Sequence, residues 1–291
     1  MRLPAIVLGA GWLTFSLSPA KSQNITAATV EETQQLLRAA ADPDISMAVW
    51  TTRSDTSAFY RRNPAVWTGS RIDLTGKAVW NSYTAPFGTT AISPRHVVYA
   101  DHVNGLYPTG TIVRFVTNAN SVVERKVVKS SRIGASDIDL SALDAALPDS
   151  IHWYKVMPEH WFLRCSRSAP GKAAGLPCLI LDANTSSVTV RDLVAFFPSG
   201  FETGAPADPL RRSFTRNLRV GDSGSPMFLL IGHELVLDGI CSTTATGAEL
   251  SSSIALLNAA MRDAGEGVKV ADLGAWSGPA NLAANAPKGP R

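Results

Sequence analysis

Ser223 has the sequence surroundings of a reactive serine, because it lies in the run Gly221-Asp222-Ser223-Gly224-Ser225-Pro226. Glycine adopts backbone angles closed to other residues and lets a substrate come close. The apolar run Met227 to Ile231 follows, so the pattern predicts a tight loop that leads into a buried strand. Successive backbone amides in such a loop can converge on one point, as an oxyanion hole requires. Taken alone, the six residues also fit a polar turn between strands.

A serine nucleophile needs a general base, and the base needs an acid to orient it. The stretch from Thr89 to Val103 is largely apolar and contains Ala100-Asp101-His102. Further on, Asp137-Ile138-Asp139-Leu140 combines carboxylates with aliphatic residues. The order is therefore histidine, aspartate, serine.

Together these three motifs resemble those of the trypsin-like (chymotrypsin-fold) serine peptidases, over about residues 75–260. The resemblance implies that His102 is the general base, Asp137 the acid and Ser223 the nucleophile, with the amides of Gly221 and Ser223 as the oxyanion hole. Asp139 is an alternative acid, because residues two apart on a strand share a face.

The sequence departs from the family at two places. Asp101 replaces the alanine that precedes the family's histidine, and its carboxylate either perturbs the pKa of the base or points to solvent. The activating tetrapeptide Ile-Val-Gly-Gly is absent, and Arg71-Ile72 is only a faint echo of it. Asp222 is therefore expected to have another partner, as in bacterial relatives that need no such insertion.

The resemblance also places a substrate pocket. Asp238 to Ser242 is similar to the strand whose serine helps to hold the catalytic aspartate, and Ser242, Thr243 and Thr244 take the pocket positions that follow. Asn217 falls where the family keeps the residue at the base of the pocket. Because it is not a carboxylate, we expect no strong preference for Arg or Lys at the cleaved position.

Short apolar runs separated by turn residues indicate an all-β protein. By resemblance, the expected fold is two six-stranded antiparallel β-barrels of the chymotrypsin/trypsin type with a C-terminal helix. The first barrel is expected at about 75–155, the second at about 156–250 and the helix at about 252–264. Two hairpins are predicted, from 111–116 with 121–128 and from 178–181 with 187–190.

The segments before and after the β-rich region differ from it in composition. Residues 1–22 predict a signal peptide, cleaved after Ser22 or Ala20. Residues 23–74 are an N-terminal extension or propeptide, in which Thr29 and Glu32 form a capping box that starts a short helix. The peptidase domain is expected at 75–265, and residues 266–291 as a flexible tail.

Composition excludes several classes of protein. The net charge of +3 is scattered along the chain, so nothing predicts nucleic-acid binding. Cys165 and Cys178 could close a disulfide in an oxidising compartment, whereas Cys241 is expected to be a buried thiol. No cysteine or histidine spacing suggests a metal site, and no cofactor is expected.

These features predict a secreted or periplasmic serine endopeptidase that cleaves polypeptide substrates through an acyl-enzyme. After removal of the signal, no segment is expected to enter a membrane. The alternative is a catalytically inactive binding module with the same fold. Nothing in the sequence indicates the oligomeric state.

Overall fold

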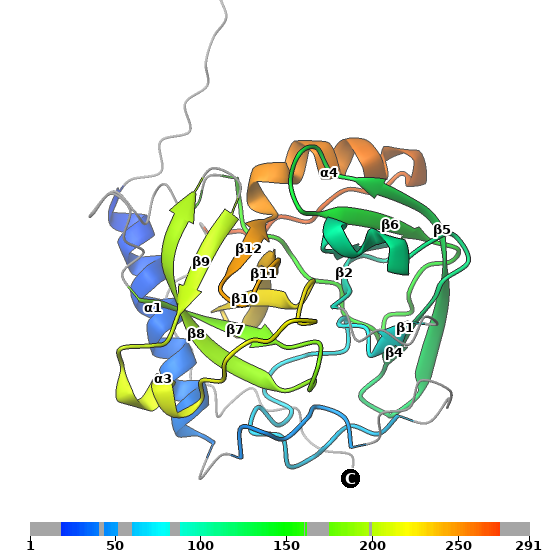
Figure 1. Ribbon diagram of the computed structural model, residues 1–291. Coiled ribbons are helices and arrows are strands. Elements are labelled where there is room, and N and C mark those ends of the chain that lie inside the picture. The colour runs from blue at the N-terminus through cyan, green and yellow to red at the C-terminus, as the bar shows by residue number, and fades with distance from the viewer. Residues whose placement is uncertain are drawn as a thin grey trace, which may run out of the picture.

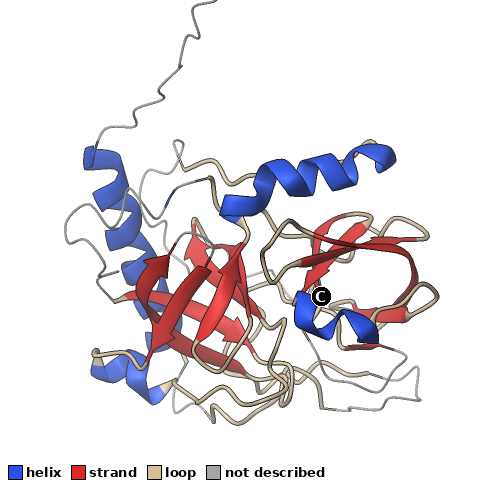
Figure 2. Cartoon of the chain, turned by 45° about the horizontal axis from the view of Figure 1, so that its top comes forward, coloured by secondary structure: helices blue, strands red, loops and turns tan. Residues whose placement is uncertain are grey.

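Short apolar runs separated by turns form twelve strands in the part of the chain that the structure describes. The structure is a computed structural model that describes residues 19–40, 44–51, 60–81, 88–159, 161, 175–197 and 200–273. The strands make two antiparallel sheets that lie side by side (Figures 1 and 2). The all-β prediction is therefore confirmed for these residues.

The first sheet has six strands in the order β1-β4-β5-β6-β3-β2. Its strands are β1 (Trp80–Asn81), β2 (Thr90–Ser93), β3 (His96–Tyr99), β4 (Ile112–Val116), β5 (Val122–Arg132) and β6 (Asp139–Leu143). It forms a half-barrel rather than the closed barrel that we expected. The physical reason is the short edge strand β1, since only an isolated bridge between Lys77 and Thr90 links the residues before it to β2.

The second sheet closes into a barrel in the order β10-β11-β12-β9-β8-β7. Its strands are β7 (Leu176–Leu181), β8 (Val188–Phe197), β9 (Gly200–Gly204), β10 (Pro226–Ile231), β11 (Glu234–Cys241) and β12 (Thr246–Glu249). A six-stranded second barrel was predicted, and the structure confirms it. The short helix α3 (Pro209–Ser213) lies in the connection between β9 and β10.

Both predicted hairpins form. β4 pairs with β5 through a turn in which Asn120 takes a φ of 65°, a left-handed conformation that asparagine tolerates. β7 pairs with β8 up to Leu181 opposite Val188, and the turn is held by Asp182, whose carboxylate accepts the Thr185 amide at 2.6 Å.

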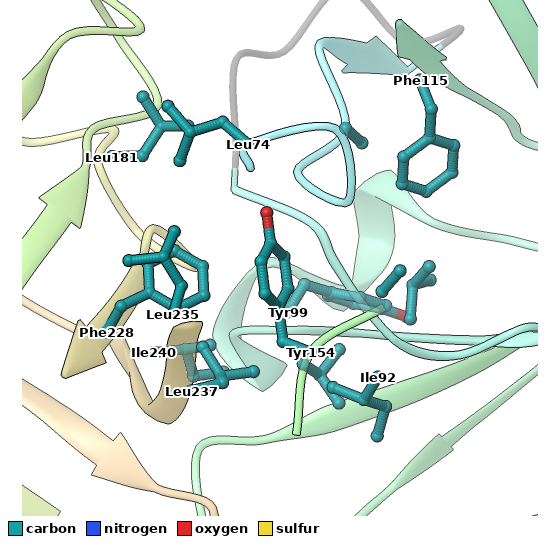
Figure 3. Packing of buried hydrophobic residues seen from close by; sticks show 14 of the residues in the cluster. Leu74, Ile92, Tyr99, Phe115, Tyr154, Leu181, Phe228, Leu235, Leu237 and Ile240 are labelled. Carbon is teal, nitrogen blue, oxygen red and sulfur yellow. The ribbon is translucent and has the colours of Figure 1, made fainter. Parts of the chain in front are cut away.

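One continuous apolar core joins the two sheets (Figure 3). Tyr154 lies in the connection between them, with its ring 4.6 Å from that of Phe228 on β10. Its amide donates to Ala91 on β2, and its hydroxyl donates to the Asp73 carbonyl. The relative position of the sheets is therefore fixed by buried contacts.

The predicted C-terminal helix is present as α4 (Ile254–Met261), extended at both ends by short 3-10 turns. Gly265 ends it with a φ of 70°. The chain then stays in contact with the body, because Glu266 lies 3.1 Å from His96 Nδ1 and Val270 pairs with Val156. The start of the expected flexible tail is thus bound to the first sheet and the linker, and residues 274–291 lie outside the described residues.

Helix α1 (Pro19–Arg38) packs against β7 and β10 of the barrel (Figure 1). It begins well before Thr29, so the predicted capping box is wrong: Thr29 and Glu32 lie inside the helix, and both are fully buried. Glu32 instead accepts the amides of Gly232 and His233 at 3.0 Å, in the tight turn between β10 and β11.

Because Glu32 satisfies two backbone amides, we expect Glu32→Ala to lower the free energy of unfolding by roughly 2 to 4 kcal/mol. Urea denaturation measures the change. Glu31→Ala is the matched control, since Glu31 makes only partly exposed contacts with Gln35 and Arg38. Equal effects of the two substitutions would show that Glu32 does not tie the helix to the barrel.

The rest of the N-terminal extension is also built into the fold. The Trp67 indole donates to the Val188 carbonyl at 2.9 Å, and the Arg62 guanidinium donates to the carbonyls of Val116 and Thr117. These contacts reach both sheets, as a packing arm would. In the described residues no helix is long and apolar enough to cross a membrane. Residues 1–18 lie outside that part, so the signal peptide stays a prediction.

The sequence left open whether Cys165 and Cys178 form a disulfide. Cys178 is a free, buried thiol that donates to the Arg191 carbonyl at 3.4 Å, and Cys165 lies outside the described residues. Cys178 lies on β7, every residue of which is buried. Cys241 is a free buried thiol, as expected, and burial raises its pKa to about 12.

Candidate active site

The loop from Gly221 to Ser225 holds Ser223 at the start of β10. Gly221 and Gly224 have φ values of 97° and 75°, which L side chains rarely adopt. The Gly224 amide donates to the Cys241 carbonyl at 2.7 Å. A Cβ added at Gly88 would lie 2.2 Å from the backbone of Gly224, so glycine is also needed where the first sheet meets the loop.

His102 lies between the other two predicted site residues. It follows β3 in a 3-10 segment (Asp101–Leu106), and its Nε2 is 2.8 Å from Ser223 Oγ. Its Nδ1 is 2.8 Å from Asp137 Oδ2, and its backbone amide donates to Asp137 Oδ1 at 2.9 Å. A carboxylate at Nδ1 keeps the proton of a neutral imidazole there, so Nε2 is free to accept the proton of Ser223.

Between the two possible acids, the geometry selects Asp137. Asp137 lies in the loop before β6, whereas Asp139 is the first residue of that strand and pairs with Tyr99. The Asp139 side chain is buried, and burial raises its pKa. No hydrogen bond joins it to His102 within the described residues.

One of the two alternatives for Asp101 was that its carboxylate points to solvent. The structure rules this alternative out, because the side chain is buried. Its Oδ2 lies 3.2 Å from Arg132 Nε, at the end of β5. The departure from the family pattern is therefore balanced by a cation on a neighbouring strand.

Some backbone amides of the loop from Gly221 to Ser225 donate hydrogen bonds within the protein, and others do not. The Asp222 amide donates to the Arg219 carbonyl, and those of Gly224 and Ser225 donate to Cys241 and Asp222. The amides of Gly221 and Ser223 donate to no atom in the part of the chain that the structure describes. They are the two donors that the sequence assigned to an oxyanion hole, and both remain available to a ligand.

Asp222 has a partner that the sequence did not reveal. Its Oδ1 accepts the backbone amide and the side-chain amide of Asn184, both at 2.9 Å, and its Oδ2 accepts the Arg219 amide at 2.6 Å. Burial raises the pKa of Asp222, and these amides oppose that shift. Asn184 lies in the predicted turn between β7 and β8, so the loop that carries Ser223 is held by a hairpin.

The predicted pocket residues are only partly brought together. Asn217 is exposed and lines a cavity of about 10 Å³ that Ser242, Thr243 and Thr244 do not line. Ser242 and Thr243 both donate their amides to Thr246 and so close the tight turn between β11 and β12. No hydrogen bond joins Ser242 to Asp137 among the described residues, so the contact that the resemblance implied is not formed. The turn holds the backbone of Ser242 through its bond to Thr246.

Two carboxyl groups are buried in the barrel that carries Ser223. Asp238 on β11 accepts the Trp161 indole N–H at 2.6 Å, and Glu249 on β12 accepts the Ser251 hydroxyl. The second oxygen of each has no partner within the described residues. Burial raises both pKa values, that of Glu249 to about 7.

The pKa of Glu249 is 4.5 in the unfolded chain and about 7 in the folded protein. Between pH 4.5 and pH 7 the folded protein therefore binds one proton more than the unfolded chain. The free energy of unfolding should therefore fall as pH rises from about 4.5 to 7, by on the order of 3 kcal/mol. Glu249→Gln should remove the share of this loss that belongs to Glu249 and leave the share of Asp238, whose pKa burial also raises, as urea denaturation at pH 5 and pH 8 would show. Glu202→Gln, at an exposed position of β9, should keep it. An unchanged pH dependence in Glu249→Gln would contradict the assignment.

No family model matches the chain, and no curated protein matches it significantly. What the site can do therefore follows from its own geometry. A hydroxyl, an imidazole and a carboxylate stand in line beside two free amides, which is an arrangement suited to acyl transfer.

Proposed function

We propose that the protein is a trypsin-like serine endopeptidase that cleaves peptide bonds through an acyl-enzyme. The observation that carries this proposal is the line from Ser223 Oγ through the His102 ring to Asp137, with 2.8 Å at each step. The position of these three residues between a half-barrel and a closed barrel also supports a trypsin-like peptidase. His102 and Asp137 follow or precede strands of the first sheet, and Ser223 precedes a strand of the second.

In the proposed reaction, Ser223 Oγ attacks the peptide carbonyl carbon while His102 Nε2 takes its proton. The oxyanion accepts hydrogen bonds from the Gly221 and Ser223 amides, and one such donor is typically worth roughly 3 to 4 kcal/mol. His102 then protonates the leaving amine as the C–N bond breaks. Water, deprotonated by His102, hydrolyses the ester and restores Ser223.

Export through a signal peptide at residues 1–22 is the second part of the proposal. It rests on the charge of Arg2 and the apolar run that follows. The substrate would then be an extracytoplasmic polypeptide.

The test is cleavage of a peptide library by the purified chain, read by mass spectrometry, beside a His102→Ala variant. We expect new termini with the wild type and none with the variant. A folded wild type that leaves the library intact would favour the binding-module alternative.

A further inference from the structure

Arg191 is a cation buried inside the barrel that carries Ser223. It lies on β8 and is only 7% exposed. No carboxylate of the described residues lies within ion-pair distance of its guanidinium. An unpaired buried charge is costly, so its presence calls for an explanation.

The acidic residues around it are engaged elsewhere. Asp192, the next residue, pairs with Arg211 at 2.9 Å. Asp222 is held by Asn184 and Arg219. Asp238 accepts the indole N–H of Trp161 at 2.6 Å, and burial raises its pKa. None of them neutralises Arg191.

The hydrogen bonds of Arg191 tie it to both flanks of the predicted substrate pocket. Nη1 donates to the carbonyl of Arg216, the residue before Asn217, at 3.3 Å. Nε and Nη2 donate to Thr203, which itself donates twice to Ala245. Ala245 directly follows Thr244. These three bonds leave two of the five guanidinium N–H groups for a ligand.

We propose that Arg191 selects substrates with Asp or Glu at the residue whose carbonyl is attacked. Asn217, Thr243 and Thr244 are exposed. Arg191 bonds to the residue before Asn217 and, through Thr203, to the residue after Thr244, and a guanidinium binds carboxylates through paired hydrogen bonds. An acidic side chain that enters between these residues is therefore the ligand that Arg191 would take. This inference rests on the proposed peptidase function. The sequence predicted only that Arg and Lys are not preferred at the cleaved position. The present inference also names the residues that are preferred, Asp and Glu.

Three peptides that differ only in Glu, Gln or Lys at the cleaved position test the proposal. We expect kcat/KM for Glu to exceed that for Gln by about 10- to 100-fold, from one charge-assisted contact, and Lys to be the poorest. Arg191→Gln should abolish the advantage of the Glu peptide over the Gln peptide. Arg191→Lys should restore part of it. Arg262→Gln is the control, because this exposed arginine at the end of the C-terminal helix should not affect the preference.

The rate of labelling by a fluorophosphonate probe separates the possible failures. A labelled wild type that cleaves all three peptides equally, or a preference for Glu that survives in Arg191→Gln, overturns the inference alone and makes Arg191 a structural residue. A folded wild type that is neither labelled nor active overturns the proposed function and the inference with it. The comparison of peptides with the wild type decides the preference even if Arg191→Gln does not fold.

Discussion

Ser223→Ala is expected to lower kcat for peptide hydrolysis by roughly 10⁵- to 10⁶-fold, because the substitution removes the only atom that would form the acyl-enzyme. The fold should be unaffected, since the described contact of Ser223 Oγ is with His102. Steady-state kinetics on a peptide cleaved by the wild type measures the loss.

Ser225→Ala is the matched control for that loss. Ser225 lies in the same loop and is fully buried, and its hydroxyl has no hydrogen-bond partner within the described residues. Removing the hydroxyl should therefore leave the rate close to that of the wild type. If Ser225→Ala were as damaging as Ser223→Ala, the nucleophile would be misassigned.

Asp137→Asn is expected to lower kcat by about 10⁴-fold with little change in structure. The asparagine can still accept the His102 amide through its oxygen, but its NH₂ group would then face Nδ1. Nδ1 becomes the acceptor and the imidazole proton moves to Nε2, where it points at Ser223. The base is then in the wrong tautomer to take a proton.

Asp139→Asn makes the same chemical change two residues away, on a side chain that makes no hydrogen bond to His102 among the described residues. Its kcat should stay close to that of the wild type. A larger loss in Asp139→Asn than in Asp137→Asn would reverse the assignment of the acid.

The parts of the fold that depend on local pattern could be predicted from the sequence. The hairpin at Asn120 and the helix ended by Gly265 follow from turn residues and periodicity. The closure of the first sheet could not, because it depends on which distant residues pair with the two-residue strand β1. The start of α1 was also missed, since Glu32 serves the barrel rather than its own helix.

The candidate site divides in the same way. His102, Asp137 and Ser223 were found through motifs, and the structure places them in contact. Their supports come from residues far away in sequence, such as Asn184 beneath Asp222 and Arg132 beside Asp101. The spacing of these residues along the sequence does not indicate that they are in contact. The turn at Ser242 was misjudged because its own backbone bonds decide where the serine lies.

The most direct test of the central claim is reaction of the folded chain with a fluorophosphonate, followed by mass spectrometry of the adduct. One modified residue, Ser223, is expected in the wild type, with none in Ser223→Ala and a strongly slowed reaction in His102→Ala. A folded wild type that stays unmodified, or that carries the adduct on another residue, would contradict the proposal that Ser223, His102 and Asp137 form a catalytic unit.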